Sequence, residues 1–282
     1  MQARGQQPTN AQRTEWDDSA QGWDANTALV NQWLNSATDM MLRLAGIRGG
    51  SRVLDVAAGA GGQTTLIADR IGPTGSILAT DLSGELVERL LRSLERSACA
   101  VEGIAVDAQL PLGRDNAFDA AVCRLGLMLM PQPERCIAAT YAALEPGARF
   151  CAMVFAGPES NPCIRILMAT ALRHAGLPPR DPFAPGGLLS LGRAGHLDLL
   201  FQNAGFAEAS TIVVDAPFPA GSVDEYMTFI RSAAAPIRAI LAKLDQDARE
   251  AAWTDIRSQL DQFSKPGGWS GPNTLLLTTG CK

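Results

Sequence analysis

The chain has 282 residues, of which 46% are hydrophobic and 19% charged, and its formal net charge is −5. These values fit one large globular domain, or one domain with a smaller lid, with a core of good size. They argue against nucleic acid as a partner, because neutralising phosphates takes a dense face of Lys and Arg side chains.

The sequence contains no apolar run long enough to span a bilayer, and its polar start does not resemble a signal peptide. We therefore expect a cytoplasmic protein without a membrane span. The six cysteines lie far apart with no C-x-x-C pair, and the sequence holds two histidines. This pattern predicts reduced core cysteines and no metal centre built from histidines.

The predicted elements begin with one or two helices between residues 15 and 45, where Leu34, Ala37 and Met41 share a face. Short apolar runs then predict strands at 52–58, 75–81, 103–108, 118–125 and 148–155. Amphipathic stretches between them predict helices at 61–72, 83–94 and 133–147. This alternation is typical of a parallel sheet covered on both faces, and right-handed crossovers make it a doubly wound α/β domain.

The rhythm changes after residue 156, where helices are predicted at 163–174 and 196–206 and strands at 208–218 and 273–280. Ser222 and Glu225 have the spacing of a capping box, which opens a helical stretch to about residue 263 with a break near Pro236. We expect a seven-stranded, mostly parallel, Rossmann-like sheet with an antiparallel last strand and a small helical cap. The stretch 222–263 either covers a pocket or pairs two subunits of a homodimer.

A cluster of small residues follows the first predicted strand, in the stretch VLDVAAGAGG that ends at Gly62. Glycines let the backbone turn sharply and let a ligand touch the main chain, and the next helix points its first N–H groups there. Asp81, at the end of the second strand, is placed to accept hydrogen bonds from two ribose hydroxyls. Asp107, after the third strand, is placed to accept one from an exocyclic amino group, with the Ala108 N–H nearby. The set fits a cofactor that carries adenosine, at the edge where open parallel sheets bind ligands.

Two details separate the candidate cofactors. In the dinucleotide fingerprint G-x-G-x-x-G/A, Gly59 and Gly61 match but the third position is Thr64. Asp55 places negative charge beside the turn, which would repel a pyrophosphate and suits a cationic or zwitterionic ligand. A nicotinamide-dependent oxidoreductase is therefore the second hypothesis. In either case a carboxylate inside an apolar strand needs a polar partner.

The pattern VLDVAAGAGG…ATDLS…VDA, with the segment 110–150 after it, resembles the class I S-adenosylmethionine-dependent methyltransferases. In style it is similar to their small-molecule branch of the ubiquinone/menaquinone-biosynthesis type, over roughly residues 47–155. The resemblance implies S-adenosyl-L-methionine as the cofactor. One departure is Ala57, where the family often has Gly, and this is tolerable if the φ angle there stays below zero.

The resemblance also implies a role for each cofactor-binding residue. The methionine part falls to Asp55, Ala57, Gly59 and Gly61, the ribose to Asp81, the adenine to Leu82, Asp107 and Ala108, and the cofactor carboxylate or the acceptor to Arg124. Three of these residues also have a plain structural interpretation: Asp81 as the start of a helix, Asp107 as a solvated loop acid and Arg124 as an ion-paired arginine. The implied domains are an N-terminal helical segment at 1–46, a cofactor-binding Rossmann-like core at 47–156, a cap or insert at 157–204, and a part at 205–282 that completes the sheet and lid.

The methyl acceptor is expected between the strand ends and the cap. The candidate pocket residues are Trp16, Trp23, Met128, Met130, His174 and Phe183. Aromatic and Met side chains favour a small, apolar or aromatic acceptor, methylated by in-line transfer through positioning. Alternatively, the methionines belong to the core and the tryptophans hold the first helix. His174 and His196 are candidates for a general base, and the catalytic residues stay unassigned. A third hypothesis is a protein of this fold that binds the cofactor without transferring its methyl group.

Overall fold

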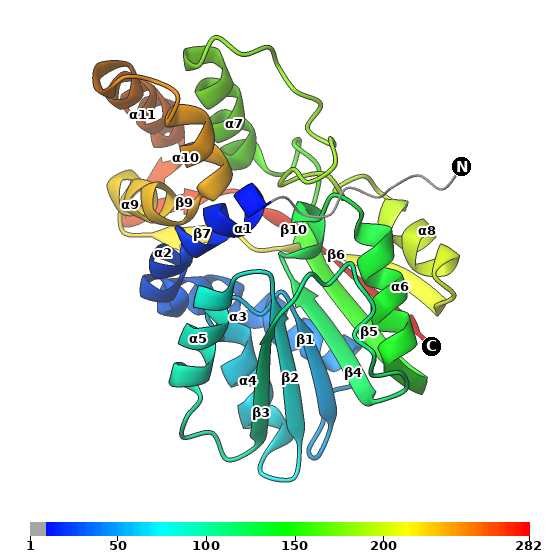
Figure 1. Cartoon of the computed structure of the whole chain (residues 1–282). Coiled ribbons are helices and arrows are strands. Elements are labelled where there is room, and N and C mark those ends of the chain that lie inside the picture. The colour runs from blue at the N-terminus through cyan, green and yellow to red at the C-terminus, as the bar shows by residue number, and fades with distance from the viewer. Residues whose placement is uncertain (1–9) are drawn as a thin grey trace.

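A seven-stranded sheet forms the centre of the computed structural model, which describes residues 10–282, with side chains from residue 13 on. Its strands are β1 (Arg52–Val56), β2 (Ser76–Asp81), β3 (Ala100–Ala105), β4 (Phe118–Arg124), β5 (Leu144–Phe155), β6 (Ala207–Asp215) and β10 (Thr274–Cys281). They lie in the order β3-β2-β1-β4-β5-β10-β6 (Figure 1). β1 to β5 run parallel, and β10 pairs antiparallel with β5 and β6. The predicted mostly parallel sheet with an antiparallel last strand is confirmed.

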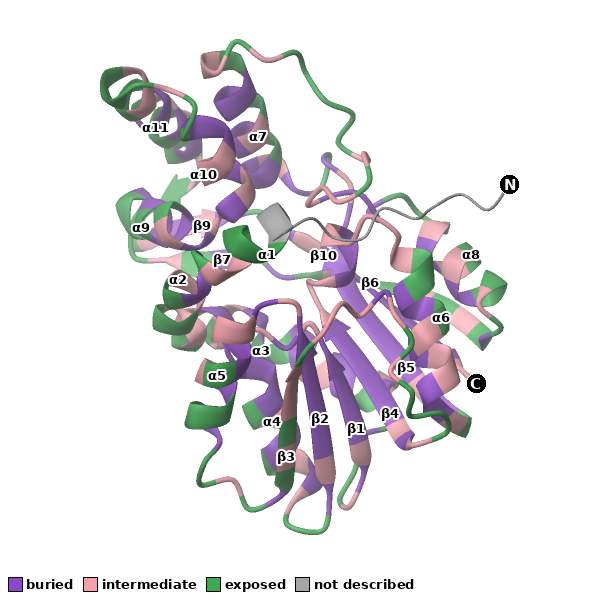
Figure 2. Ribbon diagram, in the orientation of Figure 1, coloured by how far each residue is buried: buried purple, intermediate pink, exposed green. Residues whose placement is uncertain are grey.

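The central strands are buried on both faces, which explains why they read as nearly continuous apolar runs (Figure 2). The register places Leu54 of β1 beside Leu78 of β2 on one side and Ala121 of β4 on the other. β3 lies at an edge, and its exposed Glu102 broke the apolar pattern, so the strand begins before the predicted 103–108 and ends at Ala105. β5 likewise begins earlier than predicted, at Leu144, because the helix before it ends at Ala143.

Helices cover the sheet on both faces. The helices after β1 and β2 are α4 (Gly62–Ile71) and α5 (Gly84–Ser93), and those on the other half are α6 (Pro133–Ala143) and α8 (His196–Asn203) (Figure 1). The chain moves from β1 to β2 and β3 in one direction and from β4 to β5 in the opposite one. Right-handed crossovers therefore put the two sets of helices on opposite faces, and β1 and β4 are the neighbours at which the order reverses.

The N-terminal segment contains α1 (Asn10–Asp17), α2 (Ala20–Ala25) and α3 (Thr27–Leu44), where the pattern predicted one or two helices. Ser19 and Asn26 interrupt the helical run, and both side chains bond to the backbone four residues back. A Cβ placed on Gly22 of α2 would lie 2.2 Å from the Ser232 carbonyl oxygen, so a glycine is required where α2 meets the cap. Asn26 donates to the Ser232 hydroxyl at 3.0 Å, and these helices thus join the sheet domain to the cap.

The cap stands above the carboxyl edge of the sheet (Figure 1). It consists of α7 (Pro162–His174), α9 (Val223–Ala233), α10 (Ala235–Leu241), α11 (Gln246–Leu260) and a small sheet of β7 (Phe218–Ala220), β9 (Gly268–Gly271) and β8 (Ser264–Lys265). The 3₁₀ turns are η1 (Leu127–Leu129) and η2 (Asp261–Phe263). Ser222 caps α9 by accepting a hydrogen bond from the Glu225 N–H, as predicted, and the break near Pro236 is also confirmed. The pattern did not predict the small sheet, whose strands are very short.

Candidate functional site

The glycine-rich turn between β1 and α4 has a left-handed backbone at three of its positions. The φ angles are +53° at Ala57, +61° at Gly59 and +93° at Gly61. Glycine adopts such angles at no steric cost, whereas alanine does not. The condition under which alanine at position 57 would be tolerable, a φ angle below zero, is therefore not met. A Cβ placed on Gly126 would lie 2.4 Å from the Ala57 Cβ, so glycine at 126 leaves room for the strained alanine.

Asp55 lies fully buried in β1, and its carboxylate turns toward the first turn of α4. It accepts hydrogen bonds from the Gln63 side-chain amide and, at 2.7 Å, from the Thr64 hydroxyl. Burial is the main cause that raises the pKa of Asp55, to about 7. The polar partner that the strand required is thus found in the helix that follows it.

Asp81, at the end of β2, ties the glycine-rich turn to the start of α5. One carboxylate oxygen accepts from the Gly59 N–H at 2.9 Å and the other from the Ser83 N–H at 3.0 Å. Burial raises the pKa of Asp81, while these backbone N–H groups oppose the rise. Ser83, whose hydroxyl accepts from the Leu86 N–H, is the residue that caps α5. The residue that starts the helix is therefore Ser83 and not Asp81.

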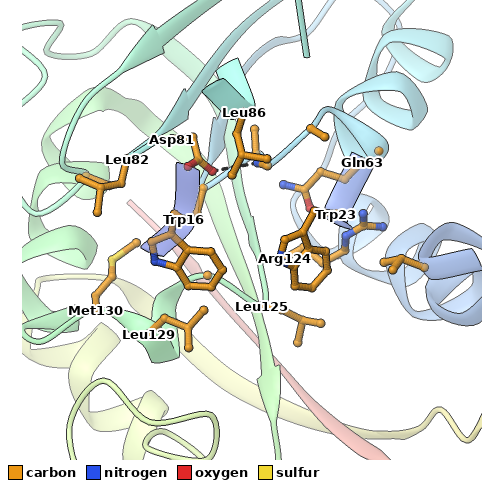
Figure 3. A pocket seen from close by; sticks show the side chains of 18 of the residues that line it. Trp16, Trp23, Gln63, Asp81, Leu82, Leu86, Arg124, Leu125, Leu129 and Met130 are labelled. Atoms are coloured by element: carbon orange, nitrogen blue, oxygen red, sulfur yellow. Dashed lines mark hydrogen bonds between the residues drawn. The ribbon is translucent and has the colours of Figure 1, made fainter. Parts of the chain in front are cut away.

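A cavity of about 1180 Å³, open solvent at its mouth included, lies at the carboxyl ends of β1, β2 and β4; we call it the first cavity. Figure 3 shows the side chains of Trp16, Trp23, Asp81 and Arg124 around the same space. The predicted cofactor residues that line the first cavity are Ala57, Gly59, Asp81, Leu82, Asp107, Ala108 and Arg124. The structure therefore brings most of the predicted residues together at the switch point of the sheet.

Among the described residues, the lining of the first cavity does not include Asp55 or Gly61, although both were predicted to contact the cofactor. Asp55 faces α4, where its carboxylate accepts a hydrogen bond from the Thr64 hydroxyl. At Gly61, a Cβ would lie 3.0 Å from the Leu90 Cγ, so this position faces α5. Both residues therefore lie on the side of the turn that faces the helices, away from the first cavity.

Opposite charges stand at separate places on the wall of the first cavity. Arg124 donates to the Thr38 hydroxyl at 3.1 Å and to the Asn31 amide oxygen at 3.2 Å, so neutral side chains of α3 hold the guanidinium. Burial lowers the pKa of Arg124 to about 10, which leaves it a cation at neutral pH. Asp107 accepts from both the backbone and side-chain N–H of Gln109, each at 3.0 Å. A wall with carboxylates and a cation suits a zwitterionic ligand.

Sequence reasoning missed Gln63, which lines the first cavity and is only 1% exposed. Its amide nitrogen bonds to Asp55, and its Oε1 has no hydrogen-bond partner within the described part of the chain. A buried carbonyl oxygen without a partner costs free energy, so it is a place for a ligand donor. The available signal was Asp55 itself, since a carboxylate in a buried strand had to be met by a nearby polar side chain.

A second cavity of about 850 Å³, again with open solvent at its mouth, adjoins the first beneath the cap. Four side chains line both cavities: Trp16, Trp23, Leu125 and Leu129. The rest of the second wall is aromatic and aliphatic, with Trp33, Phe155, Phe218, Tyr226, Phe229 and Met128 among its members. None of its described lining residues carries a charge. Because α9 and α10 contribute to this wall, the stretch 222–263 covers a pocket.

The remaining predicted pocket residues lie elsewhere. Met130 lines the first cavity, not the second. His174 hydrogen-bonds to Asp255 at 2.8 Å, between α7 and α11, and the guanidinium of Arg193 lies 4.0 Å from the centre of the Phe183 ring. Neither His174 nor Phe183 is among the described lining residues of either cavity. Helical periodicity gave the face of His174 but not its neighbour, and Phe183 lies in a turn, which has no such period.

Among residues 10–282, no helix is long and apolar enough to cross a membrane. The same residues contain no group of three or more His, Cys, Asp or Glu side chains arranged to hold a metal ion.

One part of the chain matches a known sequence family. Residues 53–147 match the family described as "Methyltransferase domain". The ubiquinone/menaquinone biosynthesis C-methyltransferase UbiE of Pseudomonas aeruginosa (strain LESB58) is 30% identical over 125 residues, which are 43% of this chain and 48% of that protein. The chain thus spans about half the length of the curated relatives that it matches.

Solved structures share the fold across nearly the whole chain. Phosphoethanolamine N-methyltransferase 2 of Haemonchus contortus, in complex with phosphomonomethylethanolamine and S-adenosylhomocysteine, has a TM-score of 0.58 at 16% identity and covers 98% of this chain and 61% of its own. The [4+2]-cyclase SpnF has a TM-score of 0.56 at 20% identity and covers 95% of this chain and 96% of its own. At such identities the likeness concerns the fold, and the two descriptions show that this fold carries different reactions.

Proposed function

We propose that the chain, whose residues 53–147 match a methyltransferase domain, is a class I S-adenosylmethionine-dependent enzyme that transfers the methyl group of S-adenosylmethionine to a small, apolar or aromatic molecule. The observation that carries this proposal is the junction of two unlike cavities. A cavity with buried charges at the switch point of the sheet adjoins a cavity whose described walls are uncharged. The first suits a zwitterionic cofactor and the second an apolar acceptor.

The residues of the first cavity fit the cofactor. The unpartnered Oε1 of Gln63 can accept a hydrogen bond from the ammonium group of the methionine part. Asp55 holds the Gln63 amide by its nitrogen and so fixes which end of the amide is free. Asp55 is therefore a positioning residue, which acts through Gln63. Arg124 is the cation for the carboxylate of the methionine part.

The adenosine part falls to the ends of β2 and β3. Asp81 keeps its carboxylate in place through the Gly59 and Ser83 N–H groups, and each oxygen can still accept from a ribose hydroxyl. Leu82 supplies an apolar surface for the base, and Asp107 with Ala108 lies at its polar edge.

When bound, the cofactor supplies a methyl group activated by a positively charged sulfur, which an acceptor atom attacks in line. The chain positions the two reactants and keeps water away from them. Trp16 and Trp23 line both cavities, so they can order a molecule in each, and good placement of two reactants contributes several kcal/mol. His174 and His196 stand apart from this junction: the first bonds to Asp255, and the second begins α8 against β6.

Calorimetric titration tests the cofactor. We expect S-adenosylmethionine and S-adenosylhomocysteine to bind with micromolar dissociation constants and NADH to show no heat of binding. Incubation with methyl-labelled cofactor and a panel of phenols, quinols, amines and thiols then tests transfer, with label expected in an apolar or aromatic member. Tight binding of NADH would refute the proposal. Cofactor binding without label transfer to any member would point to a reaction other than methylation.

A further inference from the structure

Tyr226 of α9 is a buried phenol with a hydroxyl that nothing in the described chain uses. The residue is 5% exposed and lines the second cavity. Its ring stacks on Trp269 with 4.3 Å between centroids and meets Phe218 edge-on at 5.0 Å. Its ring also lies 6.5 Å from that of Phe229, and within residues 10–282 its hydroxyl has no hydrogen-bond partner. The hydroxyl is not one of the fully enclosed polar atoms of these residues, so it is open to the second cavity, where a ligand can supply the partner.

Tyr226 belongs to the part of the second wall that the first cavity does not share. Its neighbours there, Cys163, Phe218 and Gly271, line the second cavity and are not among the described lining residues of the first. The four side chains that both cavities share form another part of this wall. A molecule that contacts both parts extends across the second cavity, so its polar atom at Tyr226 is separated from the methylated atom at the junction.

The chemistry of this part of the wall is that of a neutral donor. Burial raises the pKa of the Tyr226 phenol well above its ordinary value of 10, so the group keeps its proton and donates it. Burial also raises the pKa of the Cys163 thiol beside it, to about 12. Charged partners are missing from the described wall of the cavity, and an ion without a partner is costly to bury.

We propose that Tyr226 anchors the acceptor by donating a hydrogen bond to an oxygen at the far end of a neutral, elongated, apolar molecule. This inference rests on the proposed function, because it takes the second cavity as the acceptor site. It adds to that function a specificity-determining residue and three properties of the acceptor: no net charge, an apolar body, and an accepting oxygen remote from the methylated atom.

Matched probes test the anchor without knowledge of the natural acceptor. The probe 4-phenylcyclohexanone has a ketone oxygen at one end of an apolar body, phenylcyclohexane lacks it, and 4-phenylcyclohexanecarboxylate carries a charge. We expect calorimetry on the full chain to show the ketone bound about 3- to 10-fold more tightly than the hydrocarbon, the usual size of one neutral hydrogen bond. The carboxylate should bind about 100-fold more weakly than the ketone, or not at all.

The variant Tyr226→Phe removes the hydroxyl and keeps the ring on Trp269 and Phe218. We expect it to bind the ketone and the hydrocarbon equally and S-adenosylmethionine as the wild type does. The matched control is Tyr141→Phe, since Tyr141 lies on α6 against Phe206, away from both cavities. This control should keep the preference for the ketone. Thermal unfolding of both variants shows that the folds are intact.

The outcomes separate the anchor from the proposed function. If the wild type binds ketone and hydrocarbon equally while S-adenosylmethionine binds, the anchor is refuted and the proposed function stands. Persistence of the ketone preference in Tyr226→Phe also refutes the anchor. If S-adenosylmethionine does not bind at all, the proposed function fails, whatever the probes do.

Discussion

The two cavities differ in what holds their walls in place. The first has two ionic groups, the buried Asp81 and the half-buried Arg124, each fixed by hydrogen bonds to backbone or neutral side chains. The second is held by ring packing, such as the contact of Trp33 with Phe218 at 4.8 Å. A wall of fixed polar groups selects a ligand by charge and orientation, whereas an apolar wall selects by shape and size. The comparison indicates a strict choice of cofactor and an acceptor chosen mainly by fit.

The largest effect that would sharpen this comparison is expected from Asp81→Ala. The change removes a carboxylate that ties two backbone N–H groups and faces the first cavity, so cofactor affinity should fall about 100-fold. Binding of 4-phenylcyclohexanone in the second cavity should change less than about twofold, since Asp81 is not a lining residue of that cavity and substitutions without shared contacts usually act independently. Both are measured by calorimetry, with Asp224→Ala as the control because that carboxylate pairs with Arg257 on the surface. An equal loss of both ligands would break the distinction between the cavities.

A second effect, on stability and not on ligand binding, concerns the carboxyl group of Asp55 behind the first cavity. In the folded state the pKa of Asp55 is raised to about 7, above its unfolded value, so the folded protein binds this proton more tightly. The stability that this group contributes is therefore fully present below about pH 4 and is lost as pH rises to about 7, by an amount on the order of 4 kcal/mol. Asp55→Asn, which mimics the neutral acid, should lack this loss in urea unfolding curves taken from pH 4 to 8.

The control for that experiment has the opposite sign. Arg52 holds the pKa of Asp119 below its usual range, so this pair stabilises the protein above the unfolded pKa and stops doing so as pH falls. Asp119→Asn should therefore lose stability at neutral pH, and the difference from the wild type should shrink in acid. If Asp55→Asn shows the same trend as Asp119→Asn, the assignment of a buried, proton-binding Asp55 is wrong.

The smallest effect is expected from Ala57→Gly in the turn. Glycine relieves the strain of φ at +53°, and after the loss of chain entropy the free energy of unfolding should rise by about 0.5–1 kcal/mol. The neighbouring Ala58→Gly, at a position without a positive φ, should lower it by a similar amount. Chemical denaturation measures both. A loss of stability in Ala57→Gly would mean that the contact between the Ala57 methyl group and Gly126 outweighs the strain.

The sequence by itself determined the sheet and one of the two cavities. Alternating apolar runs and amphipathic stretches specify a doubly wound sheet, and its carboxyl edge must then carry the residues that end each strand. Gly59, Asp81 and Asp107 were found in this way, because each lies within a few residues of a strand whose period is visible in the chain. The spacing of residues along the chain is enough to predict a site residue when the end of a strand fixes the position of that residue.

Only the tertiary structure decided the rest. It turned Asp55 away from the first cavity and toward Gln63, and it took His174 to Asp255, because the neighbour of a side chain depends on which helix packs over it. The second cavity joins Trp16 to Tyr226, more than two hundred positions apart in the chain. Contacts between residues so far apart produce no periodic pattern in the sequence. Apolar packing is non-directional, so many different apolar side chains could fill the same place.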